Sequence, residues 1–264
     1  MDIFQAVVLG LVQGLTEFLP VSSSGHLVLL QKIMGVDPGS AAFLFFDTML
    51  HLGTLVAVVI VLWKDIMDII RHPTGKTLRL LFVASVPALI LVIFFGDFFE
   101  AAFGGGFLGV SFLITGLLLV LAERLANPSR KFNSARYSDA LVMGVAQGIA
   151  LLPGVSRSGA TMSGGLLTGL DREVVARFSF LMSVVAILGS VVFQAKDIVV
   201  AGIGDLPWVP VLIGTVMAAA SGVLAVRFML NFIRRHKLYV FALYVFALGV
   251  LVLLDQYVFH LVFA

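Results

Sequence analysis

A stretch near the N-terminus of this chain recurs 134 residues later, and no gap is needed to align the two copies. The first copy begins at Ala6 and the second at Ala140. The identical pairs include Ala6 and Ala140, Gly10 and Gly144, Gln13 and Gln147, Gly14 and Gly148, Val21 and Val155, Ser22 and Ser156, Ser24 and Ser158, and Gly25 and Gly159. Self-similarity at a fixed offset indicates repeated structural units. Both copies place polar side chains in apolar surroundings, so we expect them to form the two halves of one site.

Composition places this repeat in a membrane. Hydrophobic residues make up 60% of the 264 residues and charged residues only 12%, with a mean hydropathy of +1.11. Soluble domains carry about 25% charged residues. The absence of cysteine excludes disulfides, thiolate metal sites and a cysteine nucleophile. The basic residues lie in short loops between apolar runs, which is a topology signal and argues against nucleic acid as a partner. A homodimer is compatible with the sequence, which carries no pattern that specifies an assembly.

The apolar runs predict six transmembrane helices and two shorter helical segments. The six spans are expected at residues 40–63, 79–96, 107–122, 177–195, 207–226 and 238–259. The shorter segments, residues 3–36 and 139–170, are interrupted by glycine, proline and polar residues in matching positions. Such segments indicate re-entrant helical hairpins at a midplane site, here with tips at residues 20–25 and 153–158. The second hairpin is expected to consist of helices 139–152 and 159–170.

The predicted fold class is therefore an all-α integral membrane protein with six transmembrane helices plus two re-entrant helical hairpins. We expect a single membrane domain over residues 1–264, with repeat halves at about 1–126 and 136–264. Loops 64–79, 123–138, 171–176 and 227–237 hold or adjoin all of the 17 basic residues except Lys32, Lys196 and Arg157. These loops are predicted to be cytoplasmic. Three spans then separate hairpins that enter from opposite faces, so the repeat has inverted topology.

Ionisable groups inside a membrane are costly and usually functional. The first hairpin carries Glu17, His26 and the serines Ser22, Ser23 and Ser24, and the second carries Ser156, Arg157, Ser158 and Thr161. If the tips meet, Arg157 faces the acidic and hydroxyl groups of the first hairpin. Hydroxyls, helix N-terminal amides and a guanidinium fork are suited to an oxyanion. The alternative is that Arg157 only neutralises Glu17, but the many hydroxyl donors favour an anion site.

Glu17, His26 and a nearby serine resemble an acid–base group, an orienting group and a nucleophile. Each also has a plainer interpretation. Glu17 could carry a coupled proton, His26 could be a hydrogen-bonded core residue, and the serines could bond their own backbone. Asp47 and His51 lie one helical turn apart in the first span and are expected to support the site from behind rather than to contact substrate.

With these residues in view, the chain resembles the bacterial undecaprenyl pyrophosphate phosphatases, the bacitracin-resistance family, over its whole length. The matching motifs are Gln13 to Glu17, Pro20 to His26, and Pro153 to Thr161. The resemblance implies removal of the terminal phosphate from undecaprenyl pyrophosphate, a polyprenyl lipid, in cell-wall synthesis, and with it bacitracin resistance. It implies a multi-pass protein of the bacterial cytoplasmic (inner) membrane, with a site opening toward the periplasmic side.

The resemblance also assigns roles to residues. It implies a divalent cation, Mg²⁺ or Ca²⁺, with Glu17 as its candidate ligand. Catalytic roles fall on Glu17, Ser23, His26 and Arg157, and substrate contacts on Gln13, Ser22, Ser24, Ser156, Ser158 and Thr161. Position 13 departs from the pattern, because many members have glutamate there, so Glu17 is the only acid in its motif.

The expected mechanism has Ser23 attack the terminal phosphorus while His26 takes its proton. Glu17 would orient His26 or hold the cation, and Arg157 would stabilise the phosphoryl oxygens. Ser22 and Ser24 are rival nucleophiles, and an activated water is a rival for the whole scheme. A transporter or flippase of a polyprenyl phosphate lipid or another anion is the alternative function, since inverted repeats are transporter architecture. Ser23 and His26 beside an arginine-hydroxyl tip favour hydrolysis.

Overall fold

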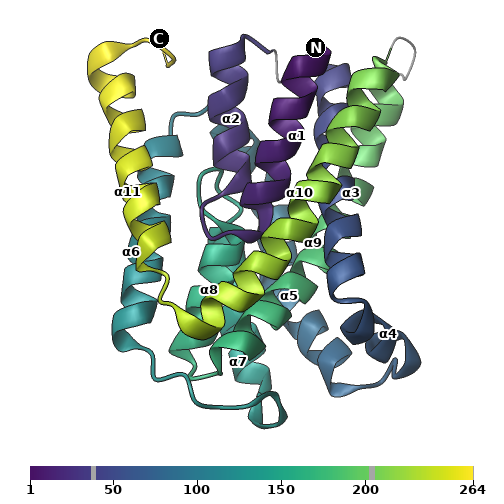
Figure 1. Ribbon diagram of the computed structural model, residues 1–264, viewed down its shortest axis with the longest axis vertical. Helices are drawn as coiled ribbons and strands as arrows, with labels where there is room; N and C mark the ends of the chain where they lie inside the picture. The colour runs from purple at the N-terminus through teal and green to yellow at the C-terminus, as the bar shows by residue number, and fades with distance from the viewer. Residues whose placement is uncertain (37–39, 202–205, 264) are drawn as a thin grey trace.

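The computed structural model describes residues 1–36, 40–201 and 206–263. Their α-helices are α1 (Ile3–Phe18), α2 (Ser23–Met34), α3 (Ala41–Val61), α4 (Trp63–Arg71), α5 (Lys76–Ala102), α6 (Leu108–Leu125), α7 (Tyr137–Ile149), α8 (Arg157–Leu167), α9 (Arg172–Ala201), α10 (Trp208–Arg235) and α11 (Tyr239–Leu254). A 3₁₀ turn (Phe132–Ser134) and a π-helical turn (Asp255–Phe259) complete the described secondary structure, apart from one isolated bridge. The all-α prediction is confirmed (Figure 1).

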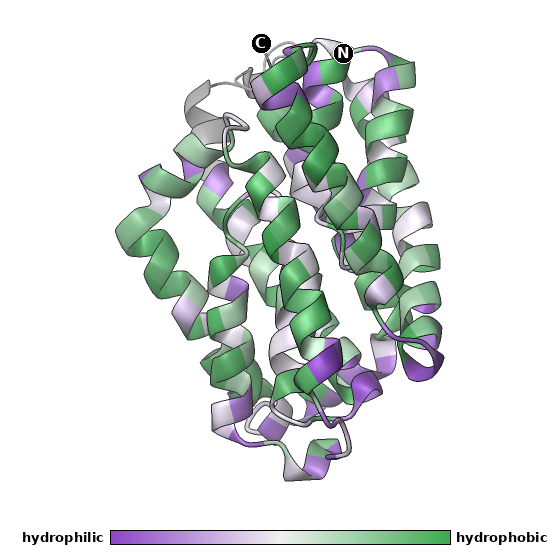
Figure 2. Ribbon diagram, turned by 90° about the vertical axis from the view of Figure 1, so that its left-hand side faces the viewer, coloured by the Kyte–Doolittle hydropathy of each residue, from purple (hydrophilic) through white to green (hydrophobic). Residues whose placement is uncertain are grey.

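Six of the described helices are long and apolar enough to cross a membrane. Their spans are Ala42–Val61, Lys76–Ala102, Leu108–Leu125, Arg172–Gln194, Trp208–Arg235 and Tyr239–Phe259. Hydrophobic residues dominate the middle of the molecule, and hydrophilic residues gather at its lower end (Figure 2). Six spans are therefore confirmed, each overlapping its predicted range, although the spans predicted at 79–96 and 207–226 extend to Ala102 and Arg235. Lys196, one of the three basic residues that do not belong to the predicted cytoplasmic loops, lies where side chains are not described.

Four segments that lie outside the predicted spans are helical. Trp63–Arg71 forms α4, because Ile66 and Ile69 share one face and pack against the core. Asp97 and Glu100 belong to the last turns of α5, which continues beyond a local non-helical residue, Phe95 (φ −131°). The expected loops at 171–176 and 227–237 are mostly the ends of α9 and α10. The changes in α5, α9 and α10 each lengthen a helix at a polar end, where apolar periodicity gives no boundary.

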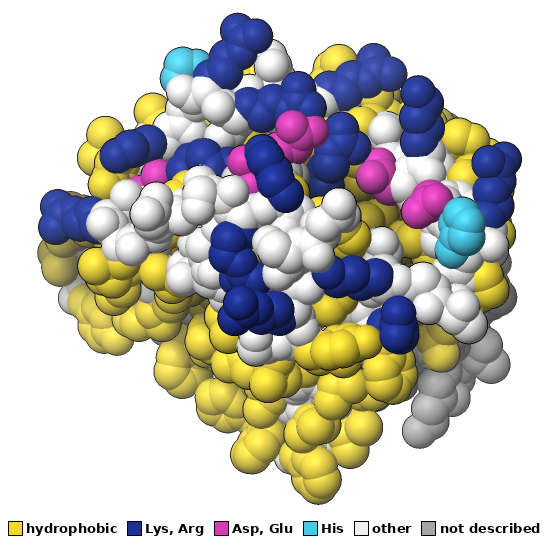
Figure 3. Space-filling model, turned by 90° about the horizontal axis from the view of Figure 1, so that it is seen from below, with side chains coloured by type: hydrophobic (Ala, Val, Ile, Leu, Met, Phe, Trp, Pro, Cys, Tyr) yellow, Lys and Arg dark blue, Asp and Glu magenta, His cyan; other side chains and the backbone are white. Residues whose placement is uncertain are grey.

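The basic loops lie at one end of the molecule, where lysine and arginine side chains crowd the surface (Figure 3). Ion pairs tie the loops together there. Arg172 donates to both carboxylate oxygens of Glu123, at 3.0 and 2.6 Å, and the Glu123 side chain is nearly inaccessible. The remaining contacts between elements include Arg130 with Asp139 and Arg177 with Asp65. Removing one member of such a buried bidentate pair strongly destabilises a protein, because the remaining charge is buried without a partner.

Two helix pairs, α1 with α2 and α7 with α8, occupy opposite halves of the molecule (Figure 1). Helix α1 packs along α10, and α7 packs along α5. Both contacts depend on glycine, because a Cβ on Gly10 would meet the backbone of Gly214, and one on Gly144 would meet the backbone of Ala84. The connecting turns of the two pairs therefore point toward each other in the interior.

Candidate active site

The two turns meet directly. A Cβ on Gly25 would lie 2.9 Å from the Cα of Gly154, so glycine is needed for the backbones to approach this closely. The Ser158 hydroxyl donates to the carbonyl of Leu19 at 2.8 Å. The predicted contact between the two copies of the repeated stretch is thus present in the structure, and it brings the starts of α2 and α8 together.

Each of these helices begins with a serine cap. Ser22 accepts a hydrogen bond from the amide of Gly25 at 3.3 Å, and Ser156 accepts one from the amide of Gly159 at 3.0 Å. A capping serine satisfies one of the free amides at a helix N-terminus. Ser22 has φ +72°, a left-handed conformation that is unfavourable for a residue other than glycine. The strain therefore falls on the turn that carries the predicted nucleophile.

Glu17 is the acceptor at the centre of the site. Arg157 Nη2 donates to Glu17 Oε1, while Ser23 Oγ and Gln13 Nε2 donate to Oε2 at 2.5 and 3.0 Å. The Glu17 side chain is 3% exposed and that of Arg157 is 23% exposed. The structure thus brings together three of the four predicted catalytic residues, and Gln13 joins them. Within the described part of the chain Glu17 is the acceptor of the Arg157 side chain, and its other N–H groups have no protein acceptor.

His26 lies on α2 beside this group but has other partners. Its Nδ1 is 2.6 Å from the carbonyl oxygen of Ser22, and its Nε2 is 2.7 Å from the hydroxyl of Tyr244 on α11. Within the described residues His26 has no hydrogen bond to Ser23. In this arrangement Glu17, rather than His26, is placed to receive the Ser23 proton. Sequence reasoning missed Tyr244; the available signal was a hydroxyl in an otherwise apolar span.

The remaining predicted hydroxyls are engaged with protein groups. Ser24 Oγ is 3.3 Å from Ser22 Oγ, and Ser156 Oγ is 3.2 Å from Ser158 Oγ. Thr161 donates to the carbonyl of Arg157 at 2.8 Å and contacts Ser179 on α9 at 2.6 Å. These contacts hold the turns and helix starts in place and leave Ser23 as the serine bonded to the carboxylate.

A second residue that sequence reasoning missed supports the α8 turn. Thr115 on α6 accepts a hydrogen bond from the amide of Ser156 at 2.9 Å and donates to the carbonyl of Gly154 at 3.2 Å. Both Thr115 and Ser156 are buried. No repeat or motif marks position 115, so only the packing of α6 against α8 reveals its role.

Asp47 and His51 lie on α3 and pair with each other. His51 Nδ1 is 3.5 Å from the Asp47 carboxylate and 2.9 Å from the Asp47 carbonyl oxygen. Among the described residues they make no hydrogen bond to Glu17, Ser23 or Arg157, and their supporting role stays a prediction.

The side-chain oxygens of Gln13 and Glu17 are the kind of ligand that a hard cation takes when most of its other ligands are not protein groups. Gln13 Oε1 is buried beside Glu17 and has no hydrogen-bond partner. Among the described residues no group of three or more His, Cys, Asp or Glu side chains could hold a metal. Mg²⁺ typically takes one or two protein oxygens and completes its shell with water and phosphate. Gln13 and Glu17 fit that mode of binding, whereas a full protein cage is not present in this part of the chain.

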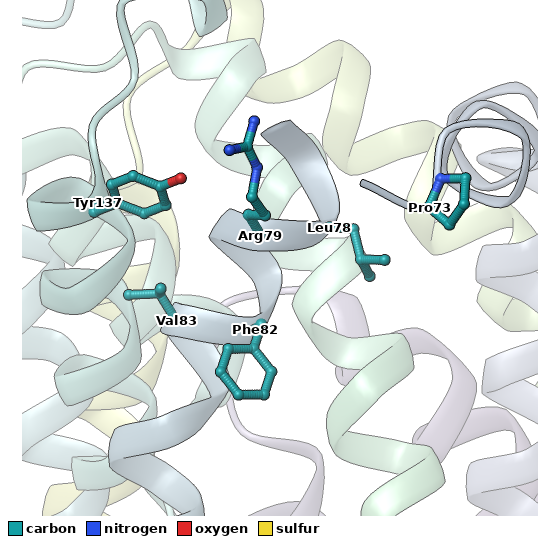
Figure 4. A pocket seen from close by; sticks show the side chains of 6 residues that line it. All are labelled: Pro73, Leu78, Arg79, Phe82, Val83 and Tyr137. Atoms are coloured by element: carbon teal, nitrogen blue, oxygen red, sulfur yellow. The ribbon is translucent and has the colours of Figure 1, made fainter. Parts of the chain in front are cut away.

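A pocket of about 400 Å³ lies elsewhere, at the end of the molecule that carries the basic loops (Figure 4). Its walls come from the turn before α5, from α5 and from the start of α7. They are formed by Pro73, Leu78, Arg79, Phe82, Val83 and Tyr137. None of these is a predicted site residue, so the candidate site is the contact between the two turns and not this surface hollow.

Comparison with known proteins identifies the family. The sequence profile of the family described as bacitracin resistance protein BacA matches residues 6–251. The chain belongs to the BacA family. BacA relatives include an undecaprenyl-diphosphatase of Carboxydothermus hydrogenoformans, 48% identical over 97% of this chain and 98% of the relative. An undecaprenyl-diphosphatase of Halothermothrix orenii is 42% identical over 96% and 98%, and undecaprenyl-diphosphatase 3 of Bacillus cereus is 41% identical over 97% and 98%.

Proposed function

We propose that this BacA family member hydrolyses undecaprenyl diphosphate to undecaprenyl phosphate and inorganic phosphate. The names of its relatives support this activity. The single observation that carries it is the contact of Ser23 and Arg157 with one buried carboxylate, Glu17, at the start of two helices. A nucleophile, a base and a cationic phosphate ligand therefore meet in an apolar bundle. The product is the lipid carrier of cell-wall synthesis, which accounts for bacitracin resistance.

In the first step Ser23 Oγ bonds to the terminal phosphorus as the bond from that phosphorus to the bridging oxygen breaks. The bridging oxygen leaves with the electron pair as undecaprenyl phosphate. The Ser23 proton passes to Glu17 Oε2, to which it is already hydrogen-bonded at 2.5 Å. This assigns the proton to Glu17, where the sequence suggested His26.

In the second step water attacks the phosphoserine. The water oxygen bonds to phosphorus, the bond from phosphorus to Ser23 Oγ breaks, and Glu17 returns its proton to that oxygen. The proton that water loses passes to His26 and then to solvent. Phosphoryl transfer of this kind depends mostly on positioning and charge stabilisation.

Arg157 supplies most of the fixed positive charge. In the resting protein its guanidinium is balanced by Glu17. A terminal phosphate carries more charge than a carboxylate and accepts from the same fork, so it takes up the N–H groups of Arg157 that Glu17 leaves free. The amides at the starts of α2 and α8 point toward the same region and add to this attraction.

The cation is proposed to be Mg²⁺ or Ca²⁺. Gln13 Oε1 and Glu17 would hold it together with diphosphate oxygens, and when bound it would neutralise charge on the diphosphate.

We further propose that the two helix pairs are re-entrant hairpins over residues 3–36 and 139–170, related by an inverted repeat of halves 1–126 and 136–264 within one membrane domain. Equivalent residues with equivalent roles support this. Ser22 and Ser156 both cap a helix, and Gln13 and Gln147 are both buried with an unpartnered Oε1. The basic end would face the cytoplasm of the bacterial inner membrane, with the site opening outward. A homodimer is part of the same proposal and is tested by size analysis in detergent.

A transporter role is not favoured, because the relatives are named as diphosphatases and the site pairs a serine with a carboxylate. The test is phosphate release from undecaprenyl diphosphate by the purified protein with Mg²⁺. We expect Ser23→Ala to lower the rate at least about 10³-fold, and Ser129→Ala, a change in an exposed loop, to keep the wild-type rate. Release by Ser23→Ala at the wild-type rate would rule out Ser23 as the nucleophile; in that case loss in Ser24→Ala would identify its neighbour. No release by the wild type would overturn the proposed function.

A further inference from the structure

We infer that Tyr244 is a positioning residue for His26: its hydroxyl holds the imidazole in one tautomer and one orientation beside the reactive turn. The inference rests on the proposed function for its kinetic consequences. Tyr244 lies on α11 and His26 on α2, and they are 218 residues apart in sequence, so the contact is a product of the fold.

The hydrogen bonds determine where the imidazole proton lies. His26 Nδ1 is 2.6 Å from the carbonyl oxygen of Ser22, and a carbonyl can only accept, so Nδ1 carries a hydrogen. In the neutral ring Nε2 then holds a lone pair. The Tyr244 hydroxyl, 2.7 Å away, must donate to that lone pair. When Nε2 gains a proton, the same hydroxyl can rotate and accept, so one side chain serves both charge states of the ring.

Ring contacts fix the orientation as well. The rings of His26 and Tyr244 stack with centroids 5.7 Å apart and planes within 8°. Phe112 of α6 meets the imidazole edge-on, at 5.6 Å and 81°. The imidazole is therefore held by an aromatic ring on two sides and by a hydrogen bond at each nitrogen.

The His26–Tyr244 pair joins the two halves of the repeat and has no counterpart at the matching positions. Residues 134 positions from His26 and Tyr244 are Ala160 and Val110. At that matching junction α8 packs along α6, whereas α2 makes no comparable contact with α11 among the described helices. The hydrogen bond between His26 and Tyr244 therefore connects α2 and α11 where their helix packing is sparse.

The kinetic test compares Tyr244→Phe, which keeps the stacked ring, with wild type, His26→Gln and the double variant. We expect Tyr244→Phe to lower kcat about 10-fold, below the 10²–10⁴-fold of a general acid–base group itself, and to leave KM unchanged. In the His26→Gln background the tyrosine change should have no further effect, because its action passes through the imidazole. Tyr239→Phe, a change on the same helix away from the site, is the matched control. Losses that multiply in the double variant, or a wild-type kcat in Tyr244→Phe, would overturn the inference.

A second measurement does not depend on activity. In ¹⁵N spectra of histidine-labelled protein, the His26 signals are those missing from His26→Gln. We expect a protonated Nδ1 and a hydrogen-bonded Nε2 in wild type, with the Nε2 signal moving to the position of an unbonded nitrogen in Tyr244→Phe. An unchanged Nε2 signal would overturn the inference even if the enzyme is active. Absent phosphate release by wild type would instead overturn the proposed function and leave this result intact.

Discussion

Glu17 accepts hydrogen bonds from side chains on three helices, α1, α2 and α8. A buried carboxylate is tolerated only when it is paired and its oxygens are hydrogen-bonded. Here Ser23 and Arg157, which stabilise the buried charge of Glu17, are also groups that the proposed reaction uses. Single substitutions at the site therefore change both the charge balance and the reaction, and conservative changes are the most informative.

Arg157→Lys tests whether the fork geometry matters. The positive charge remains, but an ammonium cannot donate to the carboxylate and to two phosphate oxygens in one plane. We expect phosphate release to fall at least about 10²-fold, the scale of losing one preorganised donor. The control is Arg124→Lys, an exposed change at the end of α6. A rate near wild type for Arg157→Lys would show that Arg157 only neutralises the charge of Glu17.

Gln13→Glu tests the proposed cation ligand. A second carboxylate beside Glu17 attracts a divalent ion more strongly than an amide oxygen does. We expect the Mg²⁺ concentration for half-maximal activity to fall roughly 10-fold, since ligand charge tunes affinity. Gln147→Glu is the matched control: Gln147 is also buried with an unpartnered Oε1, but no acid lies four residues later. An unchanged Mg²⁺ requirement in Gln13→Glu would remove position 13 from the cation site.

At the scale of elements, the helix pairs are placed by glycine contacts rather than by large interlocking side chains. A Cβ on Gly10 would lie 3.0 Å from the Cα and 3.1 Å from the carbonyl carbon of Gly214, so α1 and α10 touch backbone to backbone. Close approach of this kind is common between helices in membranes, where small residues let dispersion contacts form. The position of Glu17, two turns further along α1, depends on this contact.

Gly10→Ala should therefore destabilise the protein, by about 1–3 kcal/mol, the usual cost of overpacking. Gly189→Ala on α9 is the control, because a Cβ there meets nothing within 4 Å; alanine should be neutral or favourable by roughly 0.5–1 kcal/mol. Thermal unfolding in detergent measures both. Equal midpoints for the two variants would contradict the close packing of α1 on α10.

At the scale of the whole molecule, the basic loops share one end while both termini lie at the other (Figure 1). Because the natural chain has no cysteine, a single introduced cysteine is a unique label site. With a membrane-impermeant maleimide on intact cells, we expect Lys32→Cys to react and Lys131→Cys to react only after lysis. The reverse pattern would invert the proposed orientation, and labelling of both in intact cells would reject it.

Much of this arrangement could be predicted from sequence, for physical reasons. Long apolar runs predict membrane spans. An acid and an arginine in otherwise apolar segments predict an ion pair, because neither charge is stable alone in a membrane. Tyr244 and Thr115 could not be found in this way. Their partners depend on how α11 and α6 pack, and no repeat or spacing encodes that. For the same reason the acceptor of the Ser23 hydroxyl, Glu17 and not His26, became visible only in the structure.

The ion pair of Glu17 and Arg157 joins residues 140 positions apart, and this separation has a consequence during synthesis. At about 5–20 residues per second, roughly 7–28 s pass between the appearance of the acid and that of its partner. An unpaired carboxylate is poorly tolerated in lipid. We therefore expect the first helix pair to stay at the membrane surface until Arg157 has been synthesised. It would enter only when the second pair arrives. Activity is then a late event, and a nascent chain shorter than about 160 residues has no site at all.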